Sequence, residues 1–202
     1  MDGRMSRRGF LQQSILTTAS TTLGALPIIA AAQGAAGPPE RPVEKTNHVT
    51  VVLTVNGTAH SLTVEPRMTL AEALRGVLGL RGTKISCNRG ACSACTVWLD
   101  GAPVCSCMLL AVDVGRCAVT TIEGLAAQDH LHPIQAAFIE HDAVQCGFCT
   151  PGMVMSCASL VRDKRNATAE DVRHAISGHL CRCGTYPHAV AATLAVLAGP
   201  KA

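Results

Sequence analysis

The 202-residue sequence is poor in aromatic side chains, which make up only 2% of it: one Trp, one Tyr and three Phe. So few rings provide little material for a surface that stacks nucleobases. The formal net charge is also small, +3 at pH 7, and no basic stripe is present. Binding to nucleic acid is therefore not expected. Beyond the first 32 residues, no run is apolar enough over a sufficient length to span a bilayer.

The sequence also lacks the groupings typical of acid–base and nucleophilic catalysts. Its eight His are scattered. No Ser/His/Asp set and no pair of carboxylates is placed convincingly for such chemistry. We therefore predict that this chain carries no catalytic residue.

The first 32 residues are typical of a twin-arginine signal peptide. Arg7 and Arg8 precede a hydrophobic Phe-Leu pair and a weakly apolar run that ends at Ala32, with an A-x-A cleavage site at residues 30–32. The alternatives are an amphipathic start or a retained anchor. An anchor needs about 20 strongly apolar residues, whereas Thr residues and Pro27 interrupt this run. We expect periplasmic export by the twin-arginine route, which carries folded proteins with their cofactors already inserted.

The remaining chain divides into a linker and two regions. Residues 33–46 are rich in Gly, Pro and charge and read as a linker. Residues 47–124 predict an α+β domain, with strands over 48–55, 58–64, 96–99, 102–104 and 118–122 and a helix over 70–80 capped by Thr69 and Glu72. Residues 125–202 predict a small bundle of four helices, over 132–142, 151–163, 168–177 and 187–197.

The most informative pattern is a first set of four cysteines: Cys87, Cys92, Cys95 and Cys107. The first three form C-x4-C-x2-C, which is the spacing of plant-type [2Fe–2S] ferredoxins. One loop of this kind can wrap a cluster and direct backbone N–H groups at its sulfurs, and Gly90 lies where positive φ is useful. Zinc is the alternative, but zinc sites usually show two paired knuckles.

A second set consists of Cys146, Cys149, Cys181 and Cys183. The C-x2-C pair lies at a predicted helix start, and the C-x-C pair lies between two predicted helices. A C-x-x-C pair by itself is also typical of a redox dithiol. Spacing alone therefore favours a second cluster without deciding for it.

Three cysteines remain outside these sets. Cys105 lies two residues from Cys107 and competes with it as the fourth ligand of the first set. Cys157 falls in an apolar helix and reads as a buried small hydrophobe. Cys117 is expected to pack near the start of a strand. A disulfide among these three is compatible with an exported protein.

The stretches around both sets resemble a known family. GTKISCNRGACSACTVWLDGAPV, QCGFCTPGMVMS and GHLCRCGTYP look like the iron–sulfur subunit of the xanthine oxidase family of molybdenum hydroxylases. The resemblance covers about residues 48–198. It implies a β-grasp ferredoxin domain followed by a four-helix domain, each holding one [2Fe–2S] cluster. It also implies that Cys107, not Cys105, is the fourth ligand of the first cluster, and that Gln145 approaches the pterin; a helix-cap amide is the alternative role.

Three positions depart from the family's usual pattern. Ser86 stands where the family usually has Gly before the first cysteine, and Ser93 replaces Gly in the loop that the family writes Cys-Gly-Ala-Cys. Either hydroxyl could lie near a sulfide or point to solvent. His179 stands where the family often has Asn, and we expect a surface turn residue there, not a ligand.

These observations together predict an electron-transfer subunit. The resemblance implies a large partner subunit that binds a molybdopterin cofactor and oxidises an aldehyde or N-heterocycle. This chain would relay the electrons through two [2Fe–2S] clusters to an outside acceptor, such as a flavin or cytochrome subunit. A stand-alone two-cluster ferredoxin and a zinc protein with a disulfide are the rival hypotheses.

Overall fold

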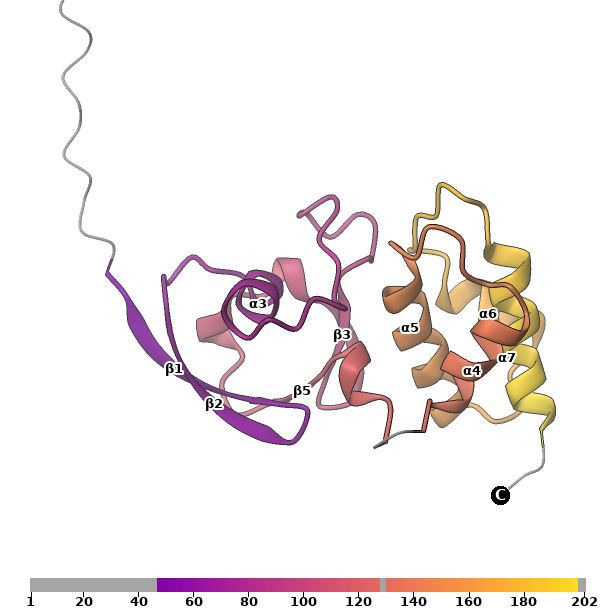
Figure 1. Ribbon diagram of the computed structural model, residues 1–202, viewed down its shortest axis with the longest axis horizontal. Coiled ribbons are helices and arrows are strands. Elements are labelled where there is room, and N and C mark those ends of the chain that lie inside the picture. Colours follow the sequence, from indigo (N-terminus) through magenta and orange to yellow (C-terminus); the bar gives the residue numbers. More distant parts are fainter. Residues whose placement is uncertain (1–46, 128–129, 200–202) are drawn as a thin grey trace, which may run out of the picture. The chain divides into compact units, whose positions relative to one another are not determined.

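The computed structural model describes residues 47–127 and 130–199, which belong to one structural unit. The predicted signal peptide and the linker lie outside the described residues. None of the helices described is long and apolar enough to cross a membrane. In Figure 1 the strands and α3 run from indigo to magenta, and the later helices run from orange to yellow.

The first region is built on a five-stranded mixed sheet with the strand order β2-β1-β5-β3-β4. Strands β1 and β2 pair antiparallel, β1 and β5 pair parallel, and β3 pairs antiparallel with both β5 and β4. The strands are β1 Val49–Val55, β2 Thr58–Val64, β3 Thr96–Leu99, β4 Ala102–Cys105 and β5 Ala118–Thr120. All five predicted strands are therefore present, and β5 ends earlier than expected.

Turn chemistry sets the two hairpins. Asn56 and Gly57 have φ values of 51° and 80°, and Asp100 and Gly101 have 48° and 83°. Positive φ at both central residues is the requirement of the tight hairpin turn. The register Val55↔Thr58 follows directly from the first turn. Alternate residues of β1 and β2 then face the same core, so Leu53, Val55, Leu62 and Val64 are at most 6% exposed.

The helix predicted over 70–80 forms only in part. Its start is as expected, because Thr69 and Glu72 make a capping box at α3, Leu70–Glu72. The chain then widens into a π-helical turn, Ala73–Val77, in which the N–H of Leu78 donates to the carbonyl of Ala73. Leu80 N–H donates to the carbonyl of Leu74 at 2.9 Å, which closes the helix end.

The second region contains the four predicted helices, displaced by no more than two residues at either end. They are α4 Pro133–Glu140, α5 Thr150–Asp163, α6 Ala169–Ala175 and α7 Tyr186–Ala198. Proline occupies the first turn of α4, α5 and α7, where its missing N–H costs no helical hydrogen bond. Thr168 and Asp171 form the expected capping box at α6.

Helix α5 joins the two regions. Almost all of its middle is buried, from Gly152 to Ser159. The indole N–H of Trp98 on β3 donates to the carbonyl of Met155 at 2.9 Å. Arg162 covers the same indole at 4.7 Å and donates to the carbonyl of Gly101 at 2.9 Å. The fold is thus a five-stranded mixed sheet with helices, as the α+β prediction requires.

Candidate functional site: two groups of cysteine thiols

The first cysteine set lies in the loop before β3 and in the 3-10 turn Ser106–Met108, which follows β4. Backbone N–H groups point at its sulfurs: Arg89 and Ala91 donate to Cys87 Sγ at 3.4 and 3.3 Å, and Gly90 donates to Cys107 Sγ at 3.3 Å. Gly90 has the predicted positive φ of 73°. The amide of Arg89 and then the Cys92 thiol lower the pKa of Cys87 to about 7. The loop is therefore shaped to stabilise negative sulfur.

Cys95 and Cys107 form a second, buried pair in this set. They are 2% and 6% exposed and pack together with Ala71. Burial raises the pKa of the Cys95 thiol to about 12, and the hydrogen-bonded Cys107 sulfur beside it contributes. The set thus consists of two neighbouring pairs: Cys87 with Cys92, and Cys95 with Cys107.

The second set joins the start of α5 to the loop between α6 and α7. The backbone N–H of Phe148 and then the Cys183 thiol lower the pKa of Cys146. Burial, followed by the Cys181 sulfur, raises the pKa of Cys149 to about 12. Cysteines 37 and 32 positions apart in the chain therefore meet as two pairs: Cys146 with Cys183, and Cys149 with Cys181.

Cys181 is held by the first turn of α7. Burial would raise the pKa of Cys181, but hydrogen bonds from the Thr185 hydroxyl and backbone outweigh it and lower the pKa to about 7. The hydroxyl lies 3.3 Å from the sulfur. The Tyr186 hydroxyl accepts from the N–H of Cys181 and donates to the carbonyl of His179, both at 2.8 Å.

A direct link connects the two cysteine loops. The N–H of Leu180, next to Cys181, donates to the carbonyl of Cys92 at 3.2 Å. An open groove of about 460 Å³ runs beside this link, lined by Ser86, Cys87, Cys92, Ala94, Phe148, Leu180, Cys181, Arg182 and Tyr186. Sulfurs of both sets therefore border one concave surface.

The rim near the second set is accessible and partly apolar. Gln145 and Cys146 are exposed. Phe148 is 46% exposed and Leu180 is 63% exposed, which is high for large apolar side chains. The expected position of Gln145 beside the first cysteine of this set is thus open to an approaching group.

The three remaining cysteines lie apart from these pairs. Cys105 Sγ contacts Ser93 Oγ at 3.9 Å, at the edge of the first set. Cys157 is fully buried in α5, as expected, and Cys117 precedes β5 with its thiol bonded to Asp100. Within the described residues, all eleven cysteines are unbridged thiols.

The prediction that His179 is a surface residue is wrong. It is 3% exposed, and its Nε2 lies 2.8 Å from Ser156 Oγ on α5. Burial lowers the pKa of His179 to about 4, so the ring is neutral at pH 7.

Sequence reasoning also missed Ser156 and Tyr186. The only signal for Tyr186 was its place after the C-x-C pair, and Ser156 gave none because its partner is 23 positions away. Of the departing serines, Ser86 is exposed and Ser93 is half-buried.

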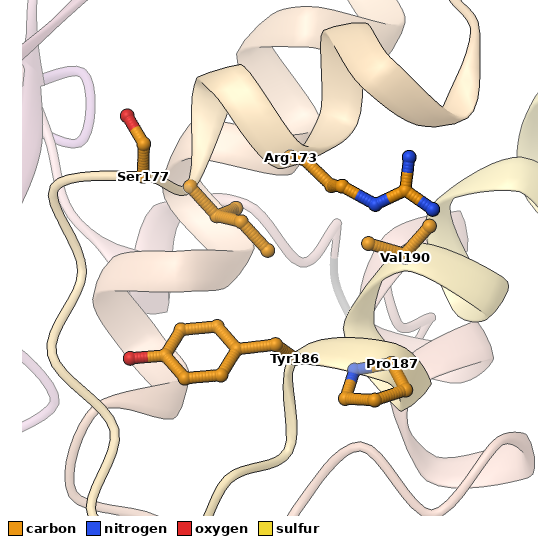
Figure 2. A pocket seen from close by; sticks show the side chains of 6 residues that line it. Arg173, Ser177, Tyr186, Pro187 and Val190 are labelled. Atoms are coloured by element: carbon orange, nitrogen blue, oxygen red, sulfur yellow. The ribbon is translucent and has the colours of Figure 1, made fainter.

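A further cavity, of about 450 Å³, lies between α6 and α7. Figure 2 shows Tyr186 and Pro187 across it from Arg173 and Ser177. No cysteine borders it. Its one connection with the cysteines is Tyr186, whose hydroxyl is already shared between His179 and Cys181. We assign this cavity no role in binding a cluster.

The donor chemistry fits binuclear iron–sulfur clusters. A [2Fe–2S] cluster takes two thiolates on each of two irons, and each set here presents two pairs. Within the described residues, no three His, Cys, Asp or Glu side chains converge closely enough to hold one metal ion. The buried Cys95 and Cys149 thiols retain their protons at neutral pH, so they become ligands only when a metal replaces the proton.

Comparisons with known proteins agree with this chemistry. A family model described as [2Fe-2S] binding domain matches residues 121–194. The aldehyde oxidoreductase iron-sulfur-binding subunit PaoA of Escherichia coli O157:H7 is 37% identical over 206 residues, covering 95% of this chain and 87% of the relative. The 6-hydroxypseudooxynicotine dehydrogenase complex subunit beta of Paenarthrobacter nicotinovorans is 44% identical over 149 residues, covering 73% of this chain and 93% of the relative.

The chain belongs to the iron–sulfur subunit family of the molybdenum hydroxylases.

A solved structure also contains a chain with a similar fold. Quinoline 2-oxidoreductase from Pseudomonas putida 86 has a chain that superposes with a TM-score of 0.69 at 41% identity, covering 74% of this chain and 96% of that one. The family resemblance predicted from the two cysteine sets is confirmed.

Proposed function

We propose that this chain is the electron-transfer subunit of a molybdenum hydroxylase complex. A large partner subunit binds the molybdopterin cofactor and oxidises an aldehyde or an N-heterocycle. This chain relays the electrons through two [2Fe–2S] clusters to an external acceptor, which is a flavin or cytochrome subunit. The names of the relatives support this reading, since one is the iron-sulfur-binding subunit of an aldehyde oxidoreductase, one is the small FeS subunit of a nicotinate dehydrogenase and one is a subunit of a dehydrogenase complex.

The two regions form two domains, each with one cluster. Residues 47–124 form a β-grasp ferredoxin domain, in which Cys87, Cys92, Cys95 and Cys107 hold the first cluster. Residues 125–202 form a four-helix-bundle domain, in which Cys146, Cys149, Cys181 and Cys183 hold the second. The pairing of the thiols supports an assignment of Cys87 and Cys92 to one iron and Cys95 and Cys107 to the other. Likewise, Cys146 shares an iron with Cys183, and Cys149 shares one with Cys181.

One observation carries the relay hypothesis: the hydrogen bond from Leu180 N–H to the Cys92 carbonyl at 3.2 Å. It connects a residue adjacent to one set with a member of the other. The clusters supply one-electron transfer, and the chain supplies their spacing and surroundings. The exposed Gln145, Phe148 and Leu180 support a large-subunit interface at the second set, with Gln145 contacting the pterin.

The complex works in the periplasm. Residues 1–32 act as a twin-arginine signal peptide, and residues 33–46 link it to the first domain. A protein that folds around its clusters in the cytoplasm needs an export route for folded chains.

Purification of the native complex tests this function. We expect a large subunit with molybdenum and pterin, about four iron atoms per copy of this chain, and two distinct EPR signals after reduction. Recovery of this chain with its iron but without a large partner would favour the stand-alone ferredoxin. A colourless protein that contains zinc and no iron would end the cluster hypothesis.

A further inference from the structure

A polar pocket lies where the two cysteine loops meet. Its volume is about 220 Å³, and it is lined by Ser93, Thr96, Pro103, Val104, Cys105, Ser156, His174, Ala175, Ser177, Gly178 and His179. The first five come from the first cysteine loop, β3 and β4, and the others come from α5, α6 and the segment before Cys181. None of the eight proposed ligands borders it.

His179 is fixed within this junction. Its ring is 3% exposed and hydrogen-bonds through Nε2 to the buried Ser156 hydroxyl at 2.8 Å. Among the described residues its Nδ1 has no partner. A buried hydrogen bond of this kind is hard to replace, because breaking it leaves a second polar group unsatisfied. The ring therefore anchors its own segment to α5.

Ser93 faces the same junction from the other loop. Its φ is 55°, a left-handed conformation that a residue with a Cβ adopts at a cost. A Cβ placed on Gly178 would lie 3.2 Å from Ser93 Oγ, so the hydroxyl lies directly against the segment that carries His179. Two of the three positions at which the sequence departs from its family's usual pattern thus line one pocket.

The segment from His179 to Cys181 is held on three sides. His179 is bonded to Ser156, the N–H of Leu180 to the carbonyl of Cys92, and the Tyr186 hydroxyl bridges the carbonyl of His179 and the N–H of Cys181. Displacement of His179 would therefore move both the Leu180–Cys92 link and the Cys181 sulfur.

We propose that His179 and Ser156 are positioning residues that set the reduction potential of the second cluster by holding the Cys181 segment closed against the first cysteine loop. The proposal rests on the proposed two-cluster function. Hydrogen bonds to the sulfurs and exposure to solvent tune the potential of such clusters. A reduced cluster carries one more negative charge than an oxidised one, and water stabilises that charge. Loosening the segment therefore raises the potential.

Redox titration followed by EPR on the holoprotein tests this role. The variants are His179→Asn, Ser156→Ala and the double variant, with His174→Asn as the control because His174 is an exposed residue that borders the same pocket. We expect each single variant to raise the potential of the second cluster relative to the first by at least about 30 mV. For one electron, this is a threefold change in the equilibrium distribution between the two clusters. The double variant should shift it no further, because both singles break the same hydrogen bond.

Several results would overturn the proposal. Unchanged potentials in both single variants, additive shifts in the double variant, or an equal shift in His174→Asn would each do so. Loss of the second cluster from both single variants would also do so, since the pair would then serve assembly and not tuning. Failure of the wild-type protein to show two EPR signals would instead count against the proposed function itself.

Discussion

At the scale of single residues, each cysteine set combines an accessible sulfur with a buried one. Cys87 and Cys181 have pKa values lowered to about 7, whereas Cys95 and Cys149 have values raised to about 12. Because the thiolate and not the thiol is the metal ligand, the buried sulfurs become ligands only when metal replaces their protons.

The fourth ligand of the first cluster can be decided by a pair of substitutions two positions apart. Cys107 is buried and accepts the N–H of Gly90 at 3.3 Å, whereas Cys105 contacts Ser93 at 3.9 Å. We expect Cys107→Ser to abolish the EPR signal of the first cluster. The iron content of the chain should fall by half, from about four atoms to about two. Cys105→Ser is the control and should retain both signals. The reverse result would move the ligand to Cys105.

Sequence reasoning at this scale succeeded where the partners are close in the chain. The spacing of Cys87, Cys92 and Cys95 confines all three to one loop, so their meeting could be predicted. His179 was misjudged because its burial depends on Ser156, which belongs to another helix. A Gly-His pair between two helices looks like an exposed turn until the packing of α5 is known.

At the scale of elements, the start of α5 approaches the first cysteine loop closely. A Cβ on Gly152 would overlap the carbonyl oxygen of Ser93 and lie 3.3 Å from Ala94 Cα. Both obstacles are backbone atoms of the segment between Cys92 and Cys95. Helix α5, which begins at Thr150, can therefore pack against the first loop only if this position lacks a side chain.

Gly152→Ala tests that close approach. Because backbone must move, we expect a loss of about 1–3 kcal/mol in the free energy of unfolding and a fall of several degrees in Tm. Gly76→Ala is the matched control, since a Cβ there meets nothing within 4 Å. Calorimetry of the holoproteins compares the two. An unchanged Tm for Gly152→Ala would show that the helix does not need this contact.

The cap of α4 gives the fold a pH dependence. His132 Nδ1 accepts the N–H of Ile134 at 3.3 Å, which requires an unprotonated ring nitrogen, and burial lowers the pKa of His132. The unfolded chain therefore binds the proton more readily, so this stability is complete above about pH 6.5 and is lost as pH falls below it.

His132→Asn should remove this dependence, because Asn caps helices without titrating. We expect Tm to fall less between pH 7.5 and pH 5.5 in the variant than in the wild type. His174→Asn, a change at an exposed His, should keep the wild-type difference. Identical pH profiles for wild type and His132→Asn would contradict the role of the cap.

Most elements could be predicted because their boundaries depend on local chemistry. The Asn56-Gly57 turn, the Thr69 and Thr168 capping boxes and the prolines at helix starts all lie where the sequence indicates. The π-helical turn at Ala73–Val77 could not be, since a 3.6-residue period over 70–80 predicts an uninterrupted α-helix.

At the scale of the whole molecule, the two regions share contacts that no local pattern indicates. The indole of Trp98 on β3 donates to the carbonyl of Met155 on α5, and Arg162 on α5 donates to the carbonyl of Gly101. The N–H of Leu180 donates to the carbonyl of Cys92. The Leu180–Cys92 bond ties the two cysteine sets to each other through the backbone, and the other two contacts hold the regions together beside it. We infer that loss of iron from one set weakens the other, because the structural support for each loop includes the neighbouring region.

This interdependence bears on export. Under the twin-arginine hypothesis, a chain whose two regions close around metal acquires its clusters before it leaves the cytoplasm, because that route carries folded proteins. That hypothesis predicts that replacing Arg7 and Arg8 by Lys strands the iron-loaded protein and its large partner in the cytoplasm, because the paired arginines of a twin-arginine signal are an address read by a receptor. Arg4→Lys is the control, since it leaves the pair intact. Cell fractionation followed by immunoblotting and metal analysis measures how the protein and its iron divide between cytoplasm and periplasm. Normal periplasmic export of the double-lysine variant would refute the twin-arginine hypothesis.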